Sequence, residues 1–175
     1  MKTIVYLILG LLLCNCGGIP KYKDGNQRFL TNPKLIEGEY NNYNNDSLKL
    51  RGNSINSKIN WRKKRLDTTR YTSVKIKILN EKQLRFDFIK NDSTLKSQTF
   101  KYRLRKDGFI KLRNNNLQVV GVPWLFGGYK NVMYDLGLTK TDDLILHGYS
   151  EEAAAVMVAL FAGRRYDIKN IYKRR

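Results

Sequence analysis

The single histidine is the first residue to consider for acid–base chemistry. His147 follows the apolar residues Leu144–Leu146, and no serine-elbow motif, HExxH motif or metal-ligand cluster accompanies it in the sequence. No nucleophile and base can be assembled around it from spacing alone. We therefore interpret His147 as a packing residue at the end of an apolar strand.

Two pairs of adjacent acids are the next candidates. Asp142-Asp143 and Glu151-Glu152 both fall at predicted turns, where solvated carboxylates are expected. A glycosidase needs two carboxylates facing each other across a sugar, and no pattern among the 15 acids points to such a pair. Gly127-Gly128 is too short to form a phosphate-binding loop. We therefore expect no enzymatic activity, no metal and no cofactor.

The only two cysteines, Cys14 and Cys16, follow an apolar run over Ile4–Leu13 that begins shortly after Lys2. A helix needs about 20 apolar residues to cross a bilayer, whereas a run of about 10 is typical of a signal peptide. The run predicts a signal peptide over residues 1–16. The rest of the chain contains no cysteine, so it has no disulfide and no cysteine metal site.

Leucine stands three residues before each cysteine, in Leu11-Leu12-Leu13-Cys14 and in Leu13-Cys14-Asn15-Cys16. This spacing resembles the lipobox of bacterial lipoproteins, although neither register has the usual Gly, Ala or Ser before the cysteine. The resemblance implies acylation of the cysteine, with palmitate as a labelling probe, and anchoring to the cell envelope, in the outer membrane. We favour Cys16 over Cys14, because Asn15 is small and two glycines follow. The alternative is a plain signal peptide with unmodified cysteines.

The chain is strongly basic, with a formal charge of +18 from 33 Lys and Arg against 15 Asp and Glu. This excess favours binding to anionic lipid or another envelope polyanion, and the export signal disfavours nucleic acid. One local run combines an aromatic residue with cations and predicts a membrane or anion contact: Trp61, Arg62, Lys63, Lys64 and Arg65. The alternatives are a buried tryptophan beside a solvated basic turn, and basic faces without a partner.

A polar segment over residues 17–34 is expected to be a tether, followed by one domain over residues 35–175. The domain opens with Gly38-Glu39-Tyr40. A Gly-x-aromatic at this place resembles the first strand of lipocalin-like barrels, in which the aromatic residue closes one end. Tyr40 replaces the tryptophan of that family. The resemblance implies a barrel that holds side chains or one small ligand.

Apolar and polar residues alternate from Tyr71 to Arg113, which predicts half-buried strands separated by turns such as Asp107-Gly108. Residues 54–66 fit either a helix or a strand. The apolar run Ala153–Ala162 favours one strand buried on both faces. The expected fold is an all-β antiparallel meander of about nine strands, a barrel or a sandwich, with at most one short helix.

These features predict a non-enzymatic envelope lipoprotein that binds a small apolar ligand or an anionic envelope component. The alternative is a structural or assembly protein of the outer membrane, whose basic surface docks to anionic lipid or to an acidic partner. The oligomeric state stays open.

Overall fold

The computed structural model describes residues 25–44, 54–60, 69–113, 117–122, 126–156 and 160–175. The predicted signal peptide with Cys14 and Cys16, and the predicted contact Trp61–Arg65, lie outside the described residues. In the described part of the chain, no helix has the length and apolar character needed to cross a membrane.

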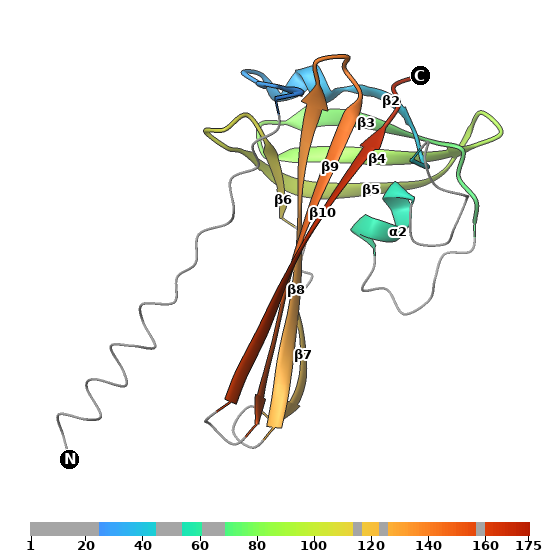
Figure 1. Cartoon of the computed structure of the whole chain (residues 1–175). Coiled ribbons are helices and arrows are strands. Elements are labelled where there is room, and N and C mark those ends of the chain that lie inside the picture. Colours follow the sequence, from blue (N-terminus) through green and yellow to red (C-terminus); the bar gives the residue numbers. More distant parts are fainter. Residues whose placement is uncertain (1–24, 45–53, 61–68, 114–116, 123–125, 157–159) are drawn as a thin grey trace.

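The fold is all-β and antiparallel, as predicted (Figure 1). Besides the short helices η1 (Pro33–Ile36) and α2 (Ile55–Ile59), ten strands are described. They are β1 (Gln27–Arg28), β2 (Gly38–Asn41), β3 (Ser73–Asn80), β4 (Gln83–Lys90), β5 (Ser93–Leu104), β6 (Ile110–Arg113), β7 (Leu117–Val122), β8 (Phe126–Thr139), β9 (Leu144–Val156) and β10 (Leu160–Tyr172).

The strands follow the order β10-β9-β8-β6-β5-β4-β3-β2 and curl into a nearly closed barrel. Residues just after β10 meet β2 at the seam, where Tyr40 forms a bridge with Arg174. The amide of Asn41 donates to the carbonyl of Lys173 at 2.8 Å, and that of Arg175 donates to the carbonyl of Glu39 at 2.9 Å. The lipocalin-like barrel expected from the opening motif is consistent with this architecture.

The barrel interior is filled with large side chains. Alternating positions of β3–β6 and of the paired halves of β8–β10 supply most of the core, as the period of two predicts. The bulkiest fully buried side chains of this core are Tyr40, Tyr172, Phe86 and Phe88. Among the described residues, positions where a small ligand would sit in a hollow barrel are therefore occupied by the protein itself.

Helix α2 lies in the segment whose sequence fits both helix and strand. Ser54 caps it, its Oγ accepting from the amide of Ser57 at 3.1 Å. Ile55 and Ile59 are four residues apart, so they share one face, and both are buried in the barrel core. Packing of this pair selects the helix.

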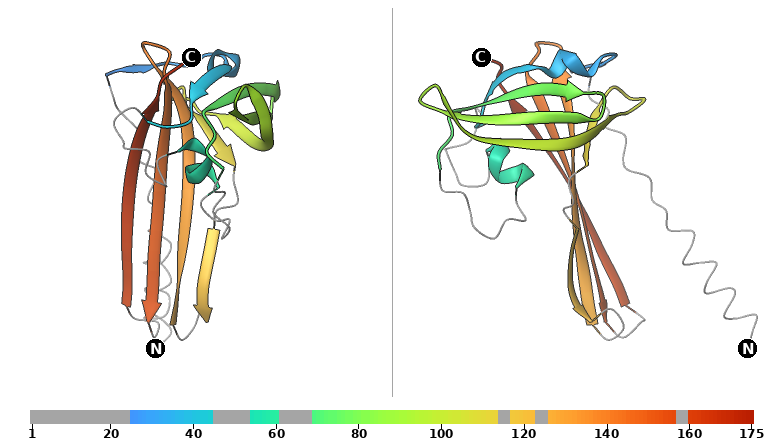
Figure 2. Two further views of the ribbon diagram at one scale, coloured as in Figure 1. Left: turned by 90° about the vertical axis from the view of Figure 1, so that its right-hand side faces the viewer. Right: turned by 180° about the vertical axis from the view of Figure 1, so that it is seen from behind.

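Strands β8, β9 and β10 are long, with 14, 13 and 13 residues. One half of each belongs to the barrel, and the other half continues away from it as a four-stranded extension with β7 (Figures 1 and 2). We call this extension the arm. It consists of residues 117–122, 126–131, 150–156 and 160–166.

The arm corrects the prediction of one strand over Ala153–Ala162. The chain reverses between β9 and β10, and Val156 pairs with Leu160. Both halves of the run are equally apolar, so the sequence carries no turn signal there. The turn predicted at Glu151-Glu152 is also wrong, because this pair lies inside β9. Gly127-Gly128, a residue pair typical of turns, lies inside β8. In the arm the glycines pair with Ala155 and Ala154, and small residues oppose one another across the sheet.

Part of the segment expected as a tether lies against the barrel. Gln27 and Arg28 pair with Thr139 and Leu138 of β8, and η1 follows. Gly108 sits nearby in the predicted Asp107-Gly108 turn with φ of +81°, and a Cβ there would lie 2.8 Å from the amide nitrogen of Leu30. This predicted turn is confirmed, and it requires glycine.

Candidate functional site

The outer surface of strands β3–β6 is strongly basic. The residues between the core positions of these strands lie on the outside, because successive side chains of a strand point to opposite faces. Seven of them are cationic and form what we call the basic face: Lys75, Lys77, Arg85, Lys101, Arg103, Lys111 and Arg113. Asp87 is the acid that lies among them.

The strand register places these cations directly opposite one another. Lys77 pairs with Arg85, Lys101 with Arg113, and Arg103 with Lys111. Like charges directly opposite in a sheet are destabilising. An anion bound between them would remove that repulsion.

Few of these cations are neutralised by the protein. Arg85 Nε lies 3.0 Å from Asp87 Oδ1. In the part of the chain that the structure describes, the other six form no salt bridge within 4.0 Å. Lys75 nonetheless lies opposite Glu39 and Asp87 in the register, and Lys111 lies opposite Asp135. Lys101 has Gln83 and Arg113 across from it, and Arg103 has Lys111.

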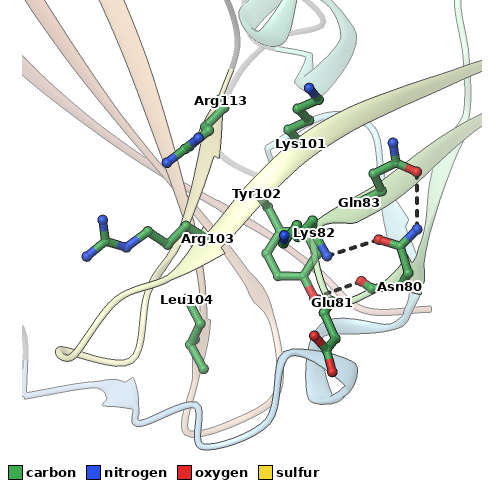
Figure 3. Close-up of a pocket in the computed structure, with 9 residues that line it drawn as sticks. All are labelled: Asn80, Glu81, Lys82, Gln83, Lys101, Tyr102, Arg103, Leu104 and Arg113. Atoms are coloured by element: carbon green, nitrogen blue, oxygen red, sulfur yellow. Dashed lines mark hydrogen bonds between the residues drawn. The ribbon is translucent and has the colours of Figure 1, made fainter.

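An open hollow of about 930 Å³ lies at one end of the basic face (Figure 3). It is formed by the β3–β4 turn together with β5 and β6. Its lining carries four cations and one acid, and consists of Asn80, Glu81, Lys82, Gln83, Lys101, Tyr102, Arg103, Leu104 and Arg113. Its chemistry suits an anion with several charges.

Hydrogen bonds fix the turn that borders the hollow. Asn80 Oδ1 accepts from the amide of Lys82 at 3.0 Å, and its Nδ2 donates to Gln83 Oε1 at 3.2 Å. The Tyr102 hydroxyl donates to the carbonyl of Asn80 at 3.1 Å. Burial raises the pKa of Tyr102, so this hydroxyl stays protonated at neutral pH. These hydrogen bonds hold the backbone of the β3–β4 turn in place at the border of the cation-lined hollow.

His147 belongs to a separate cluster on the outside of β8–β10. It is 2 % exposed and lies beside Phe109, with ring centroids 6.3 Å apart, while its Nε2 bonds Asp167 Oδ1. Asp135, opposite it on β8, accepts from Arg105 at 2.5 Å. The described residues contain no group of three or more metal-ligating side chains. The sequence did not reveal these acidic neighbours, because they come from other strands.

The predicted acid pairs take structural partners. Asp142 forms an ion pair with Arg28, and Asp143 accepts from the amide of Arg174 at 3.0 Å. Glu152 forms an ion pair with Lys130. Glu151 accepts from the Tyr149 hydroxyl at 2.7 Å.

Comparisons with protein-family models, with curated proteins and with solved structures give no match. The functional argument therefore rests on the residues and their geometry.

Proposed function

We propose that the protein is a lipid-anchored, non-enzymatic envelope protein whose basic face binds an anionic envelope component. The observation that carries the proposal is the hollow whose lining brings together Lys82, Lys101, Arg103 and Arg113 with a single acid, Glu81. Phosphate groups of lipids or of lipopolysaccharide have the matching charge. The lipobox-like residues before Cys16 support a location where such groups are abundant.

The register supports a multivalent ligand. Lys101 and Arg113 are directly opposite, and Arg103 lies two residues further along β5. Paired residues across a sheet lie about 5 Å apart, and next-but-one residues lie about 7 Å apart. A ligand with several phosphates can contact all three side chains at once.

An apolar ligand inside the barrel is the less supported alternative. Buried side chains such as Phe86, Phe88 and Tyr172 occupy the interior. The second candidate, an assembly protein that docks to an acidic partner, would use the same basic face. Binding of a soluble, phosphate-rich ligand distinguishes the two functions, because only the first predicts it.

The test uses the full chain in phosphatidylcholine nanodiscs, titrated with deacylated lipopolysaccharide core. The variant Lys101→Ala/Arg103→Ala/Arg113→Ala should bind at least about tenfold more weakly, because each lost charged contact contributes on the order of 1 kcal/mol. Binding to the native chain should also weaken as salt is added.

The matched control is Lys90→Ala/Lys106→Ala/Lys140→Ala, which removes the same charge from exposed positions outside the hollow. Equal losses in the two triple variants would show that net charge alone acts, and would refute a site. Absence of binding to the native chain, with capture of an acidic protein instead, would favour the assembly role.

A further inference from the structure

The outer half of the arm is a sheet without charged residues. Its four rows are Val119/Tyr129/Ala153/Gly163, Val120/Gly128/Ala154/Ala162, Gly121/Gly127/Ala155/Phe161 and Val122/Phe126/Val156/Leu160. We call these rows the distal arm. The chain connecting them is uncharged as well, so residues 119–129 and 153–163 contain no Asp, Glu, Lys, Arg or His. Because no residue of these rows is charged, the sheet has no charged residue to present on either face.

Charge returns abruptly at the next two rows towards the barrel. The first contains Lys130, Glu152 and Arg164, and the second contains Asn131, Glu151 and Arg165. We call these rows the collar. Tyrosines flank it: Tyr129 is 42 % exposed on the distal side, and Tyr166 is 43 % exposed on the barrel side. Tyrosine and cationic residues are the ones favoured at the headgroup level of a membrane.

The dimensions of the distal arm fit one leaflet. Four residues per strand span about 14 Å at about 3.4 Å per residue. One leaflet of the hydrocarbon core is about 15 Å thick. The distal arm would thus occupy a leaflet when the collar lies among the headgroups.

Lipid suits the distal arm better than a second copy stacked on it. A stacked copy covers one face of a sheet and leaves the other in water, whereas hydrocarbon covers both faces. Val119, 61 % exposed, shows that apolar surface of the distal arm is uncovered in the single chain.

We propose that the distal arm inserts into one leaflet of a bilayer, with the collar at the headgroups. The barrel then stands on the membrane through the arm, in addition to any acyl anchor. The inference is independent of the basic face, because it requires neither anionic lipid nor low salt.

The test is quenching of tryptophan emission by phosphatidylcholine that carries bromine on its acyl chains. The full chain is reconstituted in these vesicles in high salt, with Trp61→Phe and Trp124→Phe as background. Val119→Trp reports the distal arm. Leu95→Trp, at a position 55 % exposed on β5, is the matched control on the barrel. Both sites are exposed, so neither replacement disturbs the core.

Val119→Trp should lose about half or more of its emission in brominated vesicles, while Leu95→Trp keeps its own. Undiminished emission from Val119→Trp would overturn the proposal. Equal quenching at both positions would also overturn it, because the barrel would then lie in the hydrocarbon. Neither result depends on the phosphate binding tested above.

Discussion

Asp135 is the residue whose burial has the clearest energetic consequence. It is 6 % exposed, and its Oδ1 has no hydrogen-bond partner, while Oδ2 accepts from Arg105 at 2.5 Å. Burial raises the pKa of this carboxyl, and Arg105 opposes the rise. Ionisation of the Asp135 carboxyl is therefore less favourable in the folded barrel than in the unfolded chain.

Asp135→Asn should remove a pH-dependent loss of stability. A raised folded pKa gives stabilisation that is complete below the usual carboxyl range and is lost as the pH rises through the raised value. The variant cannot ionise. The free energy of unfolding of Asp135→Asn, relative to that of the native chain, should therefore increase as the pH rises towards neutrality. The increase starts near about pH 4, because the pKa of an aspartate in the unfolded chain is about 3.9. Chemical denaturation at several pH values measures this; a constant difference would contradict it.

Arg105→Met tests the same pair from the other side. It leaves the Asp135 carboxylate without its main cation, so the loss of stability at neutral pH should be about 3 kcal/mol. The loss should shrink in acid, where the carboxyl becomes protonated. Denaturation at neutral and acidic pH gives both values, and an equal loss at the two would count against the pairing.

Gly137→Ala tests the close approach of the Phe109 ring to the backbone of β8 at Gly137. A Cβ at Gly137 would lie 2.6 Å from Cε1 of Phe109, whose ring is buried. The ring must move, so we expect a loss of about 1–3 kcal/mol. Gly25→Ala is the matched control, since no heavy atom lies within 4 Å of its Cβ. Thermal unfolding of both variants decides, and equal melting temperatures would reject the contact.

Among the elements, the barrel seam depends on the last residues of the chain. The two backbone hydrogen bonds made by Lys173 and Arg175 join the C-terminus to β2. The Arg174 guanidinium also lies 5.7 Å from the centroid of the Tyr40 ring. Closure therefore uses three residues that follow β10 and that no sequence period marks.

Deleting residues 173–175 should open the seam and lower the stability by about 2 kcal/mol, because each net hydrogen bond contributes about 1 kcal/mol. Backbone exchange measured by mass spectrometry should show faster exchange in β2 and unchanged exchange in β4. The triple replacement by alanine keeps the backbone bonds and is the control. Uniform acceleration in both strands would contradict a local seam.

The barrel elements were the most predictable, because their sequence has a clear period. Val74, Ile76 and Ile78 alternate with lysines, and they form β3 as expected. The adjacency of β6 and β8 was not predictable, since β7 intervenes in the chain and leaves the barrel for the arm. The reversal after Val156 was also missed, because an apolar run on both sides gives no period and no turn residue.

The candidate site was predictable in composition only. The sequence shows cations between core residues of β5 and β6, yet the pairing of Lys101 with Arg113 requires the register. The hollow also needs the β3–β4 turn, which lies about twenty residues earlier in the chain. Its position depends on long-range pairing that no local pattern specifies.

At the scale of the whole molecule, the arm extends away from the barrel as a separate region (Figure 2). The described core cluster draws on the barrel halves of β8–β10, beginning at Val132 on β8. Replacing each of the segments 119–129 and 153–163 by a two-residue Asn-Gly turn should thus leave the melting temperature of the barrel nearly unchanged. Phosphate binding should persist. A large fall in melting temperature, compared with the native chain, would show that the arm supports the core.

Insertion should also depend on how many copies share the membrane. β7 and β10 are the edge strands of the arm, and hydrocarbon does not satisfy free backbone groups. Pairing of β7 from one copy with β10 from another would satisfy them. Quenching of Val119→Trp should therefore increase with the protein-to-lipid ratio. A constant value across ratios would rule out such pairing.

The three long strands that pass from the barrel into the arm have a mechanical consequence. A pull along the arm would load the ladders between β8, β9 and β10 lengthwise, so many hydrogen bonds would resist together rather than break one after another. A force applied at the tip of the arm would be transmitted to the seam at Lys173 along β10, which is one continuous strand. The molecule is thereby built as a stiff strut.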